Sequence, residues 1–160
     1  MAKWLEIAKT YKGLREKPGA ANNPIIVNWL LGLKAWWLDD ATPWCGTFVA
    51  HCMRQAGIEP AKAWYRAKAW ADWGNALNFG QLAPGAVIVF ERAGGGHVGF
   101  YVGEDKTHFH ILGGNQSDAV NVMRLEKSRA IAARWPAGAP YKPAPVRLTA
   151  NSAAVSKNEA

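Results

Sequence analysis

The order of hydrophobic patterns along the chain is the feature that most restricts its fold. Up to about residue 73 the apolar residues recur at the spacing of helices, whereas from Ala86 to Trp135 they form short runs typical of strands. Helices that precede strands, rather than alternate with them, indicate an α+β fold. A length of 160 residues suits a single domain with a buried core.

Residues 44–57, WCGTFVAHCMRQAG, form the most informative predicted helix. Apolar residues follow Cys45 at intervals of three, four, seven and eleven and define one face: Phe48, Val49, Cys52 and Ala56. Pro43 precedes the helix, and Gly57 is suited to end it. Cys45 then lies in the first turn, where unpaired N–H groups and the helix dipole lower the pKa of a thiol. The sequence therefore predicts a nucleophilic thiolate at Cys45.

The two cysteines of the chain are Cys45 and Cys52. Seven positions on one straight helix correspond to a rise of roughly 10 Å. A disulfide requires Cα atoms closer than about 7 Å. We therefore expect two free thiols, with Cys45 at the exposed start of the helix and Cys52 buried two turns later.

Further helices are predicted on both sides of the cysteine helix. Residues 3–11 have one apolar side, and Asn23 followed by Pro24 has the pattern of an N-cap and first helical residue. Residues 61–73 are rich in alanine, the best helix former, so we expect a helix there. Strands are predicted at residues 86–92, 97–103, 107–112, 119–125 and 128–135.

His97 opens the second predicted strand, HVGFYVG. Alternate residues of a strand point to opposite faces, so the even positions suit the core and His97 shares the other face with Gly99. Because Gly99 has no side chain, another element can approach beside the histidine, and we expect the start of the Cys45 helix there. A thiol next to an imidazole gives a thiolate–imidazolium pair, the working state for acyl transfer.

A third polar group is needed to hold the other nitrogen of the His97 ring. Asn115 is the first choice, because it follows a Gly–Gly break just after the strand predicted to pair with the His97 strand. His110 and Gln116 are the alternatives. The N–H of Cys45, with one nearby donor, is expected to stabilise an oxyanion. The residues expected around the oxyanion and the substrate groove are Trp44, Gly99 and Gln116.

Four segments carry a family resemblance: DDATPWCGTFVAHCMRQAGI, PGAVIVFERAGGGHVGFYVG, ILGGNQSDAVNV and RWP. They resemble the papain-like peptidoglycan hydrolases, the CHAP and NlpC-type cysteine peptidases and amidases, and among these a compact, phage endolysin-like subgroup. The resemblance runs from about residue 4 to residue 136. It implies a nucleophile at Cys45, a general base at His97 and a third polar residue at Asn115. A glycine-rich insertion at residues 94–96 departs from the family pattern.

The resemblance also implies a fold and an activity. The implied fold is papain-like, with N-terminal helices packed on a C-terminal antiparallel sheet. The implied activity is hydrolysis of an amide bond in peptidoglycan, by a stem-peptide endopeptidase or an N-acetylmuramoyl-L-alanine amidase. A phage endolysin is the first interpretation. The alternatives are a secreted antibacterial effector or tail-associated wall hydrolase with the same chemistry, and a non-catalytic cell-wall-binding module.

Two sets of residues raise the question of a metal. His108 and His110 share a strand face, but no third ligand lies on a matching strand, so we expect no catalytic metal and no cofactor. Asp39 and Asp40 precede the Cys45 helix. Acidic residues are favoured near helix starts, so we favour capping or a surface ion pair over calcium binding there.

The formal net charge of +7 favours anionic partners. The basic residues are scattered, and no nucleic-acid-binding module is apparent, so we expect no nucleic acid partner. A peptidoglycan substrate, with possible contact to an anionic envelope, fits the charge. A compact basic hydrolase of this kind is expected to be a monomer.

The ends of the sequence differ from its middle. Residues 137–160 are rich in proline, alanine and small polar residues, so we expect an extended or disordered tail after a catalytic domain at residues 1–136. The first residues carry charges where a signal peptide would be apolar. We therefore expect synthesis in the host cytoplasm without a signal peptide, and action on the cell wall, in the periplasm or outside, after release.

Overall fold

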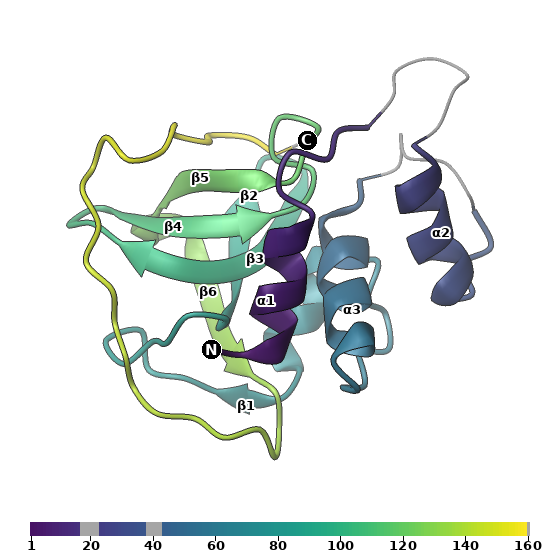
Figure 1. Ribbon diagram of the computed structural model, residues 1–160. Coiled ribbons are helices and arrows are strands. Elements are labelled where there is room, and N and C mark those ends of the chain that lie inside the picture. The colour runs from purple at the N-terminus through teal and green to yellow at the C-terminus, as the bar shows by residue number, and fades with distance from the viewer. Residues whose placement is uncertain (17–22, 38–42, 160) are drawn as a thin grey trace.

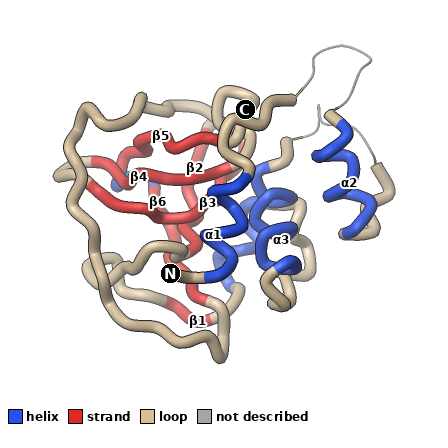
Figure 2. The backbone as a smooth tube through the Cα atoms, in the orientation of Figure 1, coloured by secondary structure: helices blue, strands red, loops and turns tan. Residues whose placement is uncertain are grey.

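The computed structural model describes residues 1–16, 23–37 and 43–159. Helices gather on one side of an antiparallel sheet, as Figures 1 and 2 show. The helices are α1 (Lys3–Thr10), α2 (Pro24–Gly32) and α3 (Cys45–Gln55). α1 and α3 contact the sheet, and α2 packs against α3. The predicted α+β, papain-like arrangement of N-terminal helices on a C-terminal antiparallel sheet is confirmed. None of the helices in the described ranges is long and apolar enough to span a membrane.

The sheet has six strands in the order β1-β6-β2-β3-β4-β5. All neighbouring strands are antiparallel. The strands are β1 (Asn75–Ala76), β2 (Val87–Arg92), β3 (Gly95–Glu104), β4 (His108–Gly113), β5 (Asn121–Glu126) and β6 (Ala130–Trp135). The five predicted strands are present. β1 was expected to be loop, and it consists of only two residues, which pair with the end of β6.

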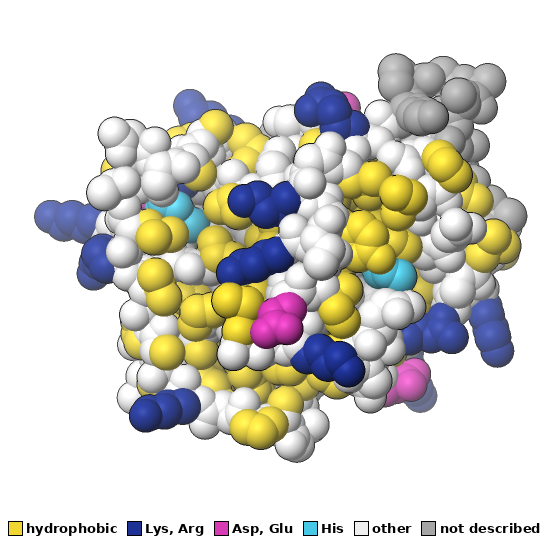
Figure 3. Space-filling model, in the orientation of Figure 1, with side chains coloured by type: hydrophobic (Ala, Val, Ile, Leu, Met, Phe, Trp, Pro, Cys, Tyr) yellow, Lys and Arg dark blue, Asp and Glu magenta, His cyan; other side chains and the backbone are white. Residues whose placement is uncertain are grey.

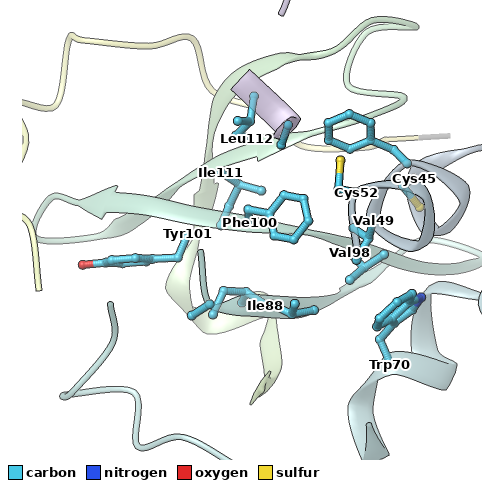
Figure 4. Close-up of a cluster of buried hydrophobic side chains, with 14 of the residues drawn as sticks. Cys45, Val49, Cys52, Trp70, Ile88, Val98, Phe100, Tyr101, Ile111 and Leu112 are labelled. Atoms are coloured by element: carbon cyan, nitrogen blue, oxygen red, sulfur yellow. The ribbon is translucent and has the colours of Figure 1, made fainter. Parts of the chain in front are cut away.

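The core lies between α3 and the strands β3 and β4. Figure 4 shows α3 side chains, among them Val49 and Cys52, facing Phe100 and Leu112. Phe48 of α3 packs edge-on against Phe100, with 6.1 Å between ring centroids. The apolar face predicted for this helix is therefore the face that binds the helix layer to the sheet. Both cysteines are free, as predicted.

The alanine-rich segment 61–73 does not form the predicted helix. Only the short 3₁₀-helix η1 (Ala67–Asp72) is present. The Trp70 ring is fully buried, and its Nε1 donates to the Trp64 carbonyl at 3.0 Å. An α-helix through residue 64 would use that carbonyl as the acceptor of one of its own backbone hydrogen bonds. Burial of the tryptophan therefore overrides the helix propensity of the alanines.

The segment after β6 runs alongside the sheet, drawn in yellow in Figure 1. It forms no helix over residues 137–159. Leu148 N–H donates to the Glu104 carbonyl at 2.8 Å, and Ser156 N–H donates to the Arg124 carbonyl at 2.9 Å. Its last described residue, Glu159, is buried. The segment is thus fastened to β3 and β5 and returns to the end of the sheet where α3 begins.

Candidate active site

Cys45 is the first residue of α3, as predicted. Trp44 occupies the N-cap position and makes no side-chain cap. The N–H of Cys45 is one of the first-turn amides that have no acceptor within the helix. This is the donor expected to stabilise an oxyanion. Cys45 itself is only 6% exposed.

Trp44 is not a groove wall in this structure. Its side chain is buried, and its Nε1 donates to Glu16 Oε1 at 3.1 Å. A Cβ placed on Gly114 would lie 2.7 Å from the Trp44 ring, so only glycine allows the ring to pack there. The prediction that Trp44 faces substrate is therefore wrong. The ring instead packs the start of α3 against the loop after β4.

His97 lies on β3 and is completely buried. Its register partner on β2 is Phe90. The His97 side chain lies close enough to the Cys45 thiol for the two groups to shift each other's pKa. The structure therefore brings the two predicted reacting groups together across the interface between α3 and the sheet.

Gln116 holds the other side of the imidazole. Its Oε1 lies 3.0 Å from His97 Nε2. Its amide nitrogen donates to three oxygens: the Ile111 and Asn121 carbonyls and Asn121 Oδ1, at 3.1, 2.9 and 3.0 Å. These acceptors fix the amide so that its oxygen faces the ring, and Nε2 of His97 must then carry a proton. Nδ1 forms no hydrogen bond within the described residues, so it is the ring nitrogen that remains available to the Cys45 thiol.

Asn115, the first choice for this position, does not contact the imidazole. Its Nδ2 donates to the Glu159 carbonyl at 3.1 Å. The backbone at Asn115 has a φ of 60°, within a turn in which Ser117 and Asp118 also have positive φ. This turn directs the Asn115 side chain away from the His97 ring. It places Gln116, one of the two alternative candidates, against the ring instead. The other, His110, bonds Asp105 Oδ2 at 2.8 Å instead.

Gly99 has a packing role rather than a place in a groove. A Cβ at this position would lie 2.4 Å from Ile111 Cγ2 on the neighbouring strand. The element that approaches Gly99 is therefore β4 and not the start of α3. The expectation that Gly99 borders the substrate groove is wrong for the same reason.

The electrostatics of the pair favour its charged form. Burial disfavours the Cys45 thiolate, yet its pKa is lowered because His97 and the N–H groups of Val98 and Gly46 stabilise the anion. Burial likewise disfavours the imidazolium, yet the pKa of His97 is raised by Cys45, Glu159 and Gln116. Both shifts widen the pH range in which thiolate and imidazolium coexist. This is the state required for nucleophilic attack by sulfur.

Cys52 provides an internal comparison. Two turns further along α3 it is fully buried, and burial raises the pKa of its thiol well above the ordinary value. Within the part of the chain that the structure describes, burial is the cause of this shift, and no cation or hydrogen-bond donor offsets it. The same helix therefore carries one activated thiol and one inert thiol.

The residues considered for a metal lie elsewhere. His110 and Arg124 both bond Asp105, at 2.8 and 2.7 Å, and His108 accepts from Arg124 Nη2 at 3.2 Å. Within the described ranges, no group of three or more His, Cys, Asp or Glu side chains is arranged to hold a metal ion. Asp39 and Asp40 lie outside the described residues.

One acidic residue near the site is not part of any motif recognised in the sequence. Glu159 belongs to the segment expected to be a tail, and its charge acts on His97. Its only sequence signal is an acidic residue in an otherwise small and polar segment. The contact depends on the path of the segment around the sheet, which local sequence does not specify.

Comparison with known families identifies a CHAP domain in the chain. Residues 37–115 match the family model of the CHAP domain. The matched span contains Cys45 and His97 and ends one residue before Gln116. No curated protein gave a significant match. Residues 37–115 are therefore similar to the CHAP domain of peptidoglycan hydrolases.

Proposed function

We propose that this protein is a cysteine hydrolase that cleaves an amide bond of peptidoglycan, with Cys45 as nucleophile, His97 as general acid and base, and Gln116 as the residue that orients His97. The observation that carries the proposal is the buried thiol–imidazole–amide series: Cys45 beside His97, and His97 Nε2 at 3.0 Å from Gln116 Oε1. The CHAP family supplies the substrate class, peptidoglycan.

The residues lead to a two-step reaction. The Cys45 thiolate attacks the carbonyl carbon, and the N–H of Cys45 stabilises the resulting oxyanion. His97 Nδ1–H gives its proton to the leaving amine, and a thioester on Cys45 remains. Neutral His97 then takes a proton from water, whose oxygen attacks the thioester. Release of the carboxylic acid restores the thiolate and the imidazolium.

Surface charge supports the proposed setting. Figure 3 shows Lys and Arg side chains spread over the visible face with few acidic side chains between them. The formal net charge is +7. A positive protein is attracted to an anionic envelope, and this attraction weakens as salt is added. We propose that the protein acts as a monomer on the wall after release from the cytoplasm, as a phage endolysin does.

Digestion of purified peptidoglycan tests the proposal. Wild type, Cys45→Ser and Cys52→Ala are compared, and soluble products are identified by mass spectrometry. Wild type and Cys52→Ala are expected to release fragments, and Cys45→Ser is expected to release none. Fragment masses separate a cut within the stem peptide from a cut at the lactyl amide.

Two results would contradict the proposal. Release of the same fragments by Cys45→Ser would exclude Cys45 as nucleophile. If the wild-type protein releases nothing from several wall chemotypes but still binds them, the chain is a wall-binding module. An inhibitory protein encoded beside the gene would instead favour an antibacterial effector with the same chemistry.

A further inference from the structure

The segment that follows β6 is attached to the sheet along its length. Gly103 on β3 makes room for Leu148, because a Cβ there would lie 2.4 Å from Leu148 Cδ1. The Tyr101 hydroxyl accepts from Val146 N–H at 3.1 Å and donates to Glu104 at 2.6 Å. Backbone bonds join Glu104 to Val146 and to Leu148, each at 2.8 Å. These contacts guide the segment across the end of β3.

The next attachment is a polar network next to β5. Ser152 Oγ lies 3.2 Å from His110 Nδ1, and His110 Nε2 lies 2.8 Å from Asp105. The backbone of Arg124 then pairs with the segment on both sides, through Ala154 and Ser156 at 2.8 and 2.9 Å. The segment therefore follows β5 as an added strand-like partner and not as a free tail.

The segment delivers Glu159 to a built site. The Glu159 side chain is completely buried, and Arg129 pairs with both of its oxygens, at 2.5 and 3.2 Å. The Ser156 hydroxyl donates to Oε2 at 2.5 Å. The Glu159 carbonyl accepts from Asn115 Nδ2 at 3.1 Å. Side chain and backbone are thus both held, by residues from three separate parts of the chain.

This site adjoins the catalytic histidine. Asn115, which binds the Glu159 backbone, directly precedes Gln116, which binds the His97 ring. The charged groups that act on His97 are Cys45 from α3 and Glu159 from the segment after β6. Arg129 faces Glu159 and partly offsets its charge. Arg129 offsets the cost of burying this carboxylate, and Asn115 joins the Glu159 backbone to the turn that holds Gln116 against the imidazole.

We propose that Glu159 is a positioning residue of the active site, whose carboxylate stabilises the imidazolium form of His97 and, through it, the Cys45 thiolate. Its effect on catalysis rests on the function proposed above. The segment 141–159 is then a part of the catalytic unit that carries a negative charge to the side of His97. The two residues then have complementary roles: Gln116 orients the imidazolium, and Glu159 stabilises its positive charge.

The titration of His97, followed by NMR in a Cys45→Ala background, tests this proposal without substrate. Failure of the hydrolase assignment therefore leaves the test intact. Glu159→Gln is expected to lower the His97 pKa by about 0.5 to 1 unit, because one negative charge is removed. Glu159→Asp, which keeps the charge, is expected to retain most of the parent pKa. Glu126→Gln removes an exposed carboxylate of β5 and is the matched control, with no expected change.

Backbone amide signals of Arg124 and Ser156 report whether the segment stays in place, since both amides bond across this contact. The proposal is supported if Glu159→Gln lowers the pKa while Glu159→Asp restores it. It is overturned if Glu159→Gln leaves the His97 pKa unchanged, or if the Asp and Gln variants lower it equally. In the active enzyme, with Cys45 present, Glu159→Gln is expected to move the alkaline limb of the pH–rate profile to lower pH.

Discussion

At the scale of single residues, reactivity follows from environment rather than residue type. His97 donates through Nε2 to Gln116, so Nδ1 is directed toward sulfur. The neutral amide orients the ring and stabilises its charged form without adding a charge of its own. Gln116 is in turn fixed by Asn121, whose Nδ2 donates to the Gln116 carbonyl at 3.0 Å. Orientation of the base thus depends on a short series of amide contacts.

Gln116→Ala is expected to lower kcat about 10- to 100-fold, a loss of about 1.4 to 2.8 kcal/mol of transition-state stabilisation. The imidazole would lose its acceptor and its fixed orientation. Asn115→Ala is the neighbouring control and is expected to cost less, because the Asn115 amide donates to the Glu159 carbonyl and not to the imidazole. Steady-state kinetics on peptidoglycan fragments measure the kcat of both variants. A larger loss for Asn115→Ala would restore Asn115 as the orienting residue.

The sequence was sufficient to predict the elements that carry Cys45 and His97, but not the residue that contacts the other nitrogen of the imidazole. Helical spacing put Cys45 at a helix start, and strand composition put His97 on a strand. The choice between Asn115 and Gln116 depended on a turn with positive φ at Asn115, Ser117 and Asp118. Adjacent residues in such a turn point in different directions, and local composition does not specify which one faces the histidine.

At the scale of elements, close packing at the start of α3 fixes the position of Cys45. Gly46 follows Cys45, and a Cβ there would lie 2.2 Å from the Trp64 carbonyl. The same carbonyl accepts from Trp70 Nε1. The segment 61–73 therefore supports α3 by an irregular backbone, which explains why its alanine content was misleading. The other predicted helices and strands were set by strong local patterns and are present, although α2 ends at Gly32 and not at the expected Trp36 and Trp37.

Gly46→Ala is expected to destabilise the protein by about 1 to 3 kcal/mol and to reduce activity, because the new methyl group forces α3 away from Trp64. Gly32→Ala is the matched control. Its Cβ would meet only the flexible end of Arg54 at 3.3 Å, so little change is expected. Urea unfolding measures the difference. Equal stability of the two variants would contradict tight packing at the start of α3.

At the scale of the whole molecule, the buried Asp105 carboxylate joins β4 and β5 where the segment after β6 attaches to them. Asp105 accepts from Arg124 at 2.7 Å, from His110 at 2.8 Å and from the N–H groups of Thr107 and His108 at 3.0 Å. Arg124 and the other donors hold the pKa of Asp105 well below its usual range. Sequence composition predicted an extended or disordered segment after residue 136. Its attachment depends on contacts distant in sequence, which composition does not reveal.

Asp105→Asn is expected to destabilise the fold by about 3 kcal/mol, because a buried ion pair loses one partner. A lowered carboxyl pKa contributes stability above the unfolded-state value of about 3.9, and this contribution is lost as pH falls below it. Wild type should therefore lose stability below about pH 4, and the variant should lack that part of the decline. Glu91→Gln is the control.

The control breaks an exposed pair, since Lys68 and Glu91 side chains are 44% and 57% exposed. Its expected change in unfolding free energy is within about 0.5 kcal/mol. Denaturant unfolding at several pH values measures all three proteins. An Asp105→Asn variant as stable as the control would show that the network does not stabilise the fold.

The proposed activity depends on the charge state of Cys45, and the rate at which Cys45 is alkylated as a function of pH measures that state. A small neutral reagent, iodoacetamide, reacts with the thiolate, and peptide mapping separates Cys45 from Cys52. The lowered pKa of Cys45 predicts rapid modification of Cys45 alone at a pH well below the ordinary thiol value of about 8.5, and slower modification after His97→Ala. A rate that rises only near that ordinary value, or equal modification of Cys52, would contradict the thiolate–imidazolium pair.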